Sequence, residues 1–263
     1  MDILSKQEIS EKIDLCKLHI EVFDEIDSTN NYAKKLILEG FKEGLIVADS
    51  QTAGRGRSGH SFYSPENTGI YMSYFFTPKN GLAGAESCTT KTAVAMVTAL
   101  ESLYSDSFNI KWVNDIYYGG KKISGILAEA VTTGINVGGI VIGIGINVST
   151  KDYPDDIKDR AGHLPVRSDI SRNDIIAEII NNLVPLLEKE TSDKSYVNLY
   201  RDHLLMIGEL VTFLDHSKSA AEAIHTTATI IDIDDECGLI VKEQDGTLRT
   251  IRNGEVSELR WTE

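Results

Sequence analysis

The chain has 263 residues, of which 41% are hydrophobic and 25% charged, as in a soluble globular protein with one large domain and a small one, or two ordinary domains. Lys and Arg number 26 against 40 Asp and Glu, and the net charge of −14 argues against nonspecific attraction to nucleic acid or an anionic membrane. There is no leader-like or membrane-length apolar run, and the three cysteines show no CxxC spacing, so we expect a reduced cytoplasmic protein without disulfides or a zinc site.

The first predicted elements are a helix, a strand, a glycine-rich loop and a second strand. Cap residues at 27–30 precede apolar residues at helical spacing, and Gly40 is a natural helix end. Residues 45–48 read as a short buried strand and residues 69–77 as an aromatic-rich strand. The loop between these strands begins with the sequence QTAGRGRSGH at residues 51–60.

This loop has the composition of an anion-binding site. Arg55 and Arg57 lie among three glycines, and no Asp or Glu occurs from residue 50 to residue 65. Glycines let backbone N–H groups approach a ligand, while guanidinium groups suit a phosphate or carboxylate. The loop also matches GxGxxG, but a dinucleotide fingerprint opens a helix and has an acid about 20 residues on, where this chain has Lys79. A glycine-rich surface turn stays open as an alternative.

The middle of the chain predicts a long helix at residues 86–104, followed by an antiparallel meander of strands at residues 109–115, 122–131 and 138–148. An exposed loop is expected at residues 151–160 and another helix at residues 171–190. Gly119-Gly120 is the expected hairpin turn, Ser171-x-x-Asp174 the expected helix cap, and Pro185 an expected kink. From about residue 208, five short apolar pieces predict a small β-barrel, and residues 232–238 read as a solvated turn. We therefore expect an α+β fold with domains at 1–205 and 206–263.

Polar residues also interrupt strands that otherwise suit a core. Lys111, Asn114 and Asp115 end one expected strand and Lys122 begins the next, so a hairpin could bring Asp115 and Lys122 together. An edge hairpin with solvated charges is the alternative. The glycine-containing strand that ends at Asn147 is either a tightly packed core strand or one that a flat ligand can approach.

Four motifs in order resemble the biotin protein ligases, and the resemblance extends over nearly the whole chain. They are Ser28-Thr29-Asn30, Gln51-Thr52-Ala53-Gly54-Arg55-Gly56-Arg57, Lys111-Trp112-x-Asn114-Asp115 and Lys122-x-x-Gly125-Ile126-Leu127. The resemblance implies a mixed, mainly antiparallel sheet with flanking helices, similar to class II synthetases. It also implies an enzyme that uses ATP and Mg²⁺ to make biotinyl-5′-AMP with release of pyrophosphate, and then biotinylates a lysine of a biotin carboxyl carrier protein.

The same resemblance assigns residues to each part of the reaction. Biotin binding is implied for Ser28, Thr29, Asn30, Gln51, Gly54, Arg55, Gly56, Arg57, Lys122 and Gly125. ATP or adenylate binding is implied for Arg55, Arg57, Lys111, Trp112, Asn114, Lys122 and Asn147. Catalytic roles fall on Lys122, Arg57 and Asp115, with Asp115 also on the Mg²⁺ side. Cations suit a step that joins two anions, and we hypothesise that Asp115 orients or deprotonates the acceptor lysine.

This chain departs from the family pattern in two ways. Ser58 and His60 stand where further arginines are common, so we expect earlier leakage of the adenylate, and Val113 stands where a proline is usual. Only 27 residues precede Ser28, so we expect a ligase that does not bind DNA as a repressor. A lipoate or octanoate ligase and an idle biotin sensor are alternatives, and a homodimer is one option for the oligomeric state.

Overall fold

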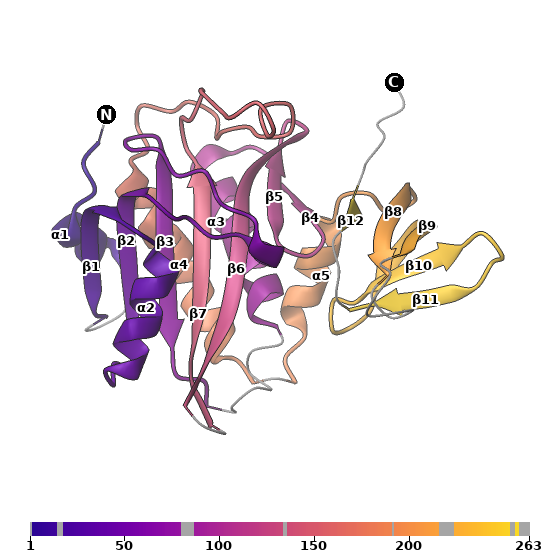
Figure 1. Ribbon diagram of the computed structural model, residues 1–263, viewed down its shortest axis with the longest axis horizontal. Helices are drawn as coiled ribbons and strands as arrows, with labels where there is room; N and C mark the ends of the chain where they lie inside the picture. Colours follow the sequence, from indigo (N-terminus) through magenta and orange to yellow (C-terminus); the bar gives the residue numbers. More distant parts are fainter. Residues whose placement is uncertain are drawn as a thin grey trace.

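Seven strands form a mixed sheet in the order β1-β2-β3-β7-β6-β5-β4 (Figure 1). The computed structural model describes residues 2–14, 18–79, 87–133, 136–190, 192–215, 224–252 and 256–257. The strands are β1 (Ile20–Ile26), β2 (Glu43–Gln51), β3 (Gly69–Phe76), β4 (Asn109–Lys111), β5 (Asp115–Tyr118), β6 (Lys121–Thr133) and β7 (Asn136–Asn147). Among them β1 and β2 run parallel, and the other neighbours pair antiparallel. The predicted mixed, mainly antiparallel sheet is confirmed.

Helices cover both faces of this sheet because its strands are apolar on both sides. Helices α3 (Cys88–Tyr104) and α4 (Arg172–Glu188) lie on one face, over the larger apolar core. Helix α2 (Thr29–Leu38) lies on the other face, where Leu36 and Ile37 pack with Phe75 (Figure 1). The predicted stop of α2 is borne out by Gly40, whose φ of +102° suits glycine.

Two predictions about helix ends can be compared directly with the structure. The capping pattern at Ser171 is confirmed as a full capping box with Asp174, and α4 continues past Pro185 as far as Glu188.

Helices α1 (Lys6–Lys12) and α5 (Ser195–Asp202) were not predicted, nor was strand β1. Both helices are short, and short elements give weak periodic signals.

The expected strand at 109–115 is wrong in one respect. Strand β4 ends at Lys111 and strand β5 begins at Asp115, so residues 112–114 form a turn between two antiparallel strands. The reason is local contacts: the carbonyl of Asn114 accepts the N–H of Ile126, and its side chain also turns toward β6. The hairpin turn at Gly119-Gly120 is confirmed, with positive φ at both residues.

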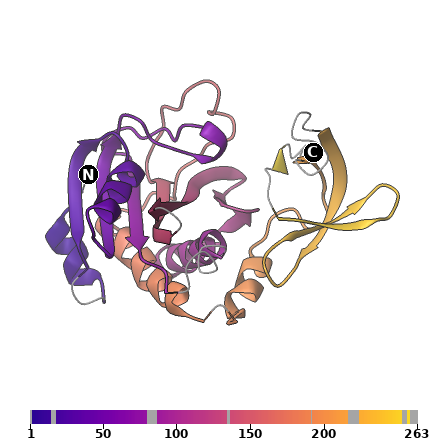
Figure 2. The same cartoon turned by 60° about the horizontal axis from the view of Figure 1, so that its bottom comes forward.

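A second sheet follows α5 and lies beside the seven-stranded sheet (yellow in Figure 2). Its strands, in the order β11-β10-β9-β8-β12, are β8 (Leu210–Asp215), β9 (Ile224–Ile233), β10 (Leu239–Glu243), β11 (Leu248–Ile251) and β12 (Val256–Ser257). The five C-terminal strands match the prediction, although no pairing within the described residues joins β11 to β12. The turn between β9 and β10 covers residues 234–238, because residues 232 and 233 belong to β9, and Cys237 within it is buried rather than solvated. No helix in the described ranges is long and apolar enough to cross a membrane.

Candidate functional site

The start of helix α2 forms a buried polar floor on one face of the sheet. Ser28, Thr29 and Asn30 are only 1%, 3% and 4% exposed. Ser28 is the N-cap residue, yet its hydroxyl makes no capping hydrogen bond to the helix that the structure describes. The backbone N–H of Thr29 donates to Gln51 Oε1 at 2.9 Å, and the Ser73 hydroxyl lies 2.6 Å from Asn30 Oδ1. The structure therefore brings the predicted residues 28–30 and Gln51 together.

Glu129 on β6 completes this floor and was missed from the sequence. Asn30 Nδ2 donates to Glu129 Oε2 at 2.8 Å, and Lys34 Nζ lies 2.6 Å from Glu129 Oε1. Burial raises the pKa of Glu129, but the hydrogen bonds from Asn30 and Lys34, together with the positive charges of Lys34 and Arg55, lower the pKa overall. In the sequence, the only indication of this role is an acidic residue between apolar residues of the predicted strand.

The arginine loop leaves β2 at Gln51 and returns to β3. The N–H of Gly56 donates to the carbonyl of His60 at 2.7 Å, and the N–H of Phe62 donates to the carbonyl of Gly54 at 3.0 Å. A side chain at position 54 would lie 2.4 Å from the Phe62 carbonyl, so this close approach needs glycine. The GxGxxG string opens no α-helix here, and the dinucleotide alternative is excluded.

Arg57 and Lys122 are held on the sheet by partners from β5 and the turn before it. The Arg57 guanidinium donates to Asn114 Oδ1 at 2.9 Å, and Asn114 Nδ2 donates to the Ile126 carbonyl at 3.0 Å. Lys122 Nζ lies 2.7 Å from Asp115 Oδ1, with the two side chains 34% and 19% exposed. The predicted approach of Asp115 and Lys122 is confirmed, and the solvated-edge alternative is wrong.

Three glycines join the floor to this cationic end. A Cβ at Gly143 would lie 2.1 Å from Asn30 Oδ1, and one at Gly145 would lie 2.5 Å from the Phe62 ring. A Cβ at Gly125 would lie 3.4 Å from Lys122 Nζ and 3.6 Å from the Phe62 ring. Glycines on β6 and β7 thus let the side chains of Asn30 and Phe62 pack closely on the sheet, in agreement with the prediction of a tightly packed strand at Gly143 and Gly145.

Arg55 and three other predicted residues have less direct places. Arg55 donates to Asn31 Oδ1 at 3.1 Å and lies 3.4 Å from Glu129, with 47% of its side chain exposed. Lys111 Nζ lies 5.9 Å from the centre of the Tyr117 ring, and Asn147 Nδ2 donates to the Gly162 carbonyl. Trp112 is buried, and its indole N–H donates to the Cys237 carbonyl in the second sheet. The nucleotide roles of Lys111, Trp112 and Asn147 stay predictions.

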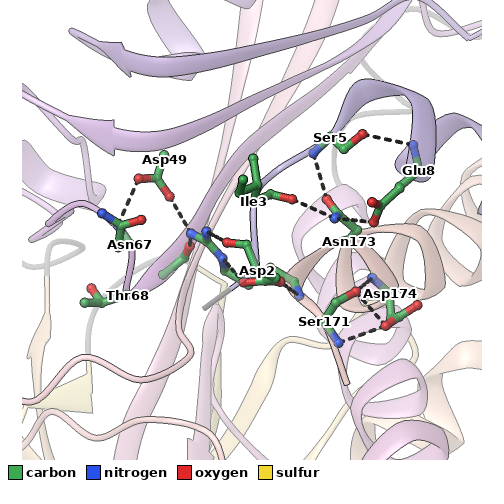
Figure 3. A network of polar contacts seen from close by, with 12 residues as sticks. Asp2, Ile3, Ser5, Glu8, Asp49, Asn67, Thr68, Ser171, Asn173 and Asp174 are labelled. Atoms are coloured by element: carbon green, nitrogen blue, oxygen red, sulfur yellow. Dashed lines mark hydrogen bonds and ion pairs between the residues drawn. The ribbon is translucent and has the colours of Figure 1, made fainter. Parts of the chain in front are cut away.

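A buried arginine ties the two stems of the loop to the start of the chain. Arg172 Nε lies 3.0 Å from Asp2 Oδ1, and its guanidinium also binds Asp49 at 2.5 Å and the carbonyl of Gly69. The second oxygen of Asp49 accepts the N–H of Asn67. Figure 3 shows Asp49 and Asn67 together on one side of this network, with Asp2 near its centre. In the sequence, the only indication of this network is an arginine directly after the predicted helix cap at Ser171.

A metal would find few protein ligands in the described residues. No group of three or more His, Cys, Asp or Glu is placed there to hold a metal ion. Asp115 offers one carboxylate beside Asn114 at the cationic end. A single carboxylate with phosphate oxygens is a common environment for Mg²⁺, so the residues fit an ion that enters with a phosphate-bearing ligand.

Two family models match separate parts of the chain. Residues 22–147 match the Biotin/lipoate A/B protein ligase family, and residues 207–257 match the Biotin protein ligase C terminal domain. The first range contains the floor, the arginine loop and the Asp115–Lys122 pair. The second contains four strands of the second sheet and the short β12.

Known proteins with ligase names are similar to this chain. The bifunctional ligase/repressor BirA of Bacillus spizizenii is 34% identical over 242 residues, which are 89% of this chain and 73% of that protein. The biotin--[acetyl-CoA-carboxylase] ligase of Paracoccus denitrificans is 32% identical over 125 residues, which are 47% of this chain and 52% of that protein. A solved biotin protein ligase from Aquifex aeolicus, in complex with biotin and ATP, is 28% identical with a TM-score of 0.76 and covers 91% of this chain and 97% of its own.

Proposed function

We propose, from the premise that this chain belongs to the biotin protein ligase family and is a biotin ligase, that it biotinylates a carrier-protein lysine in two steps through biotinyl-5′-AMP. The observation that carries this proposal is the continuity of the site. Buried, uncharged polar groups at Thr29 and Gln51 lie at one end, and the Lys122–Asp115 ion pair lies at the other, with the glycines of β6 and β7 between them. Such a surface suits a neutral ring system at one end and reacting anions at the other.

The floor supplies neutral donors and acceptors for the ureido group of biotin. Ser28, Thr29, Asn30 and Gln51 carry hydroxyl and amide groups, and the described contacts already fix most of them toward one another. A ligand that binds pre-oriented groups does not need to order them, which favours affinity. We assign the ureido and thiophene end of biotin to these four residues. Gly54 and Gly56 belong to the loop that would close over biotin and the adenylate phosphate, and Gly125 would contact biotin beside Lys122.

In the first step a biotin carboxylate oxygen bonds to the α-phosphorus of ATP, and the bond from that phosphorus to the bridging oxygen of pyrophosphate breaks. Two anions must come together, so the negative charge needs stabilisation. Arg55, Arg57 and Lys122 are the cations available for this, and each charge-assisted hydrogen bond contributes about 1.5–3 kcal/mol. Mg²⁺ would neutralise phosphate charge, with Asp115 as its protein ligand.

In the second step the carrier lysine amine bonds to the acyl carbon of the adenylate, and AMP leaves. The amine must lose a proton, which at pH 7 costs roughly 4.6 kcal/mol for a pKa of about 10.4. Asp115 is the carboxylate at this end and would orient the amine or accept its proton. This role is wrong if Asp115→Asn slows adenylation but leaves single-turnover transfer from preformed adenylate unchanged.

The decisive experiment incubates the protein with ATP, Mg²⁺ and either biotin or lipoate, and detects acyl adenylate by mass spectrometry. We expect biotinyl-5′-AMP and an equal amount of pyrophosphate with biotin and no adenylate with lipoate. Adenylate with lipoate alone would assign the chain to the lipoate branch. Biotin binding without any adenylate would make it an idle sensor, and neither product nor binding would end the proposal.

The acceptor and the assembly are tested separately. The Paracoccus denitrificans relative is named for acetyl-CoA carboxylase, which supports a biotin carboxyl carrier protein as the acceptor. Incubation with a purified biotin-free carrier domain should add one biotin at a single lysine, and a Lys→Arg carrier should stay unmodified. Sedimentation velocity with and without biotin and ATP tests the homodimer.

A further inference from the structure

The turn at residues 112–114 lies between the catalytic face and the second sheet. It connects β4 to β5, and the side chain of Asn114 at its end accepts a hydrogen bond from the Arg57 guanidinium. Asp115, the next residue, pairs with Lys122. The contacts that hold Trp112 and Val113 in place therefore also fix the position of Asn114 and of the residues that it contacts.

The first restraint on this turn comes from the second sheet. The Trp112 indole N–H donates to the carbonyl of Cys237 at 2.9 Å, and the two residues are 4% and 2% exposed. Cys237 lies in the tight turn between β9 and β10, with a φ of +59°. The Asp234 carboxylate accepts the N–H groups of Glu236 and Gly238 at 3.0 and 2.8 Å, so the acceptor belongs to an internally braced turn.

The second restraint comes from helix α5. The hydroxyl of Tyr200, a fully buried residue, donates to the carbonyl of Val113 at 3.2 Å. The next residue, Arg201, binds the Asp232 carboxylate at 2.7 Å and the Ile233 carbonyl at 3.1 Å. Helix α5 is thus attached to β9 on one side and to the turn at 112–114 on the other.

We propose that Tyr200, Trp112 and the Cys237 turn are positioning residues that make the second sheet set the placement of Asn114 and, through it, of Arg57. The inference rests on the proposed function and adds a role for the C-terminal sheet within it. Trp112 acts from the far side of the turn, because its buried indole N–H faces Cys237 rather than the catalytic face. Small displacements of a group that orients reacting atoms have large kinetic effects, which is why two hydrogen bonds suffice.

The main test compares Tyr200→Phe with the matched control Tyr74→Phe. Tyr74 is also buried, and its hydroxyl donates to Glu43 on β2, away from the turn. We expect Tyr200→Phe to lower kcat/KM for ATP in adenylation about tenfold, with the biotin dissociation constant within twofold of the original. Tyr74→Phe should change the unfolding temperature but neither kinetic quantity. Equal kinetics in the two variants would overturn the inference.

A second variant removes the other restraint without depending on the first. Trp112→Phe keeps a buried ring but has no N–H for the Cys237 carbonyl. We expect the same loss in kcat/KM for ATP and the same unchanged biotin binding. A variant that adenylates normally while folded would contradict the role of Trp112.

Coupling to Asn114 separates positioning from general destabilisation. In an Asn114→Ala background, Tyr200→Phe should reduce kcat/KM by less than twofold, because the group that it positions is absent. A full tenfold loss in that background would refute the route through Asn114. The original protein is the internal reference: if it makes no adenylate the proposed function fails, whereas an active original with an unaffected Tyr200→Phe variant rejects only this inference.

Discussion

The helix start at residues 28–30 and the arginine loop at residues 54–60 face the same sheet, but the fold fixes them to different degrees. Thr29 and Asn30 are buried, and their polar atoms already have partners at 2.6–2.9 Å. In contrast, Arg55 is 47% exposed, and its contact with Glu129 is 3.4 Å long. The floor is prepared before a ligand arrives, whereas the loop has room to change its contacts when one binds.

Because of this difference, we expect the floor and the loop to have different roles in binding and catalysis. A pre-formed surface can select a ligand by shape and hydrogen bonds, because nothing must be reorganised. A loop with exposed cations can close on charge that the ligand brings and thereby exclude water. We therefore expect changes in the floor to alter biotin binding and stability, and changes in the loop to alter adenylation and adenylate release.

The largest effect should come from Lys122→Met, which removes the cation at the meeting point of floor and loop. Loss of one group aimed at developing charge commonly lowers a rate about 10²–10³-fold, and we expect adenylation to fall by that factor. Single-turnover formation of biotinyl-5′-AMP measures it. Lys121→Met is the matched control, because the Lys121 ammonium donates to the Asp159 carbonyl instead. Similar losses in both variants would mean that position 122 is not special.

Arg57→Ala should come next, since it removes a loop cation together with its hydrogen bond to Asn114. One charge-assisted hydrogen bond is worth about 1.5–3 kcal/mol, so kcat/KM for ATP should fall about 10–100-fold and adenylate should dissociate faster. Arg57→Lys keeps the charge but loses the planar fork, and its values should lie between. Weakened biotin binding without ATP would contradict the division between loop and floor.

Two glycines on strand β7 give the sharpest comparison of the two regions. In Gly143→Ala the new Cβ would lie 2.1 Å from the fixed Asn30 amide, so stability should fall by about 1–3 kcal/mol and biotin should bind more weakly. In Gly145→Ala it would meet the Phe62 ring, whose loop can move, so the loss should be less than about 1 kcal/mol. Urea unfolding and biotin titration measure both. Equal losses would show that the loop is as rigid as the floor.

The smallest effect concerns pH and Glu129. Burial raises the pKa of this carboxyl, but the hydrogen bonds from Asn30 and Lys34, together with the positive charges of Lys34 and Arg55, lower the pKa overall. A group with a depressed folded pKa adds stability that is present above its unfolded pKa and lost as the pH falls through the folded pKa. Below about pH 4.3 the original should therefore lose stability more steeply than Glu129→Gln, by less than about 1 kcal/mol. Urea unfolding from pH 6 to pH 3 checks this, with exposed Glu66→Gln as the control.

Sequence patterns predicted the elements that depend on neighbouring residues. The capping box at Ser171 and the positive-φ turn at Gly119-Gly120 are set within a few residues, and both were found. The approach of Asp115 to Lys122 followed from that same turn. Patterns of neighbouring residues thus predicted the part of the candidate site that contains Asp115 and Lys122.

Contacts between distant parts of the chain could not be predicted in this way. Asn30 and Glu129 are 99 residues apart, and the Trp112 indole reaches a carbonyl 125 residues away. Nothing beside Trp112 in the sequence indicates that its indole N–H meets the second sheet, and its contact with ATP stays a prediction. Only the arrangement of the two sheets reveals that this indole contacts protein.

The Arg172 network has a consequence for the protein while it is being synthesised. Residues 28–147 contain the floor and the Lys122–Asp115 pair, yet Arg172 must join Asp49 and Asp2 across 123 and 170 residues. At about 5–20 residues per second, the ribosome exposes the loop several seconds before Arg172 leaves the exit tunnel. In the last part of that interval, after Gly125 has emerged, the nascent chain has every residue assigned to biotin but not the arginine that clamps both stems of the loop.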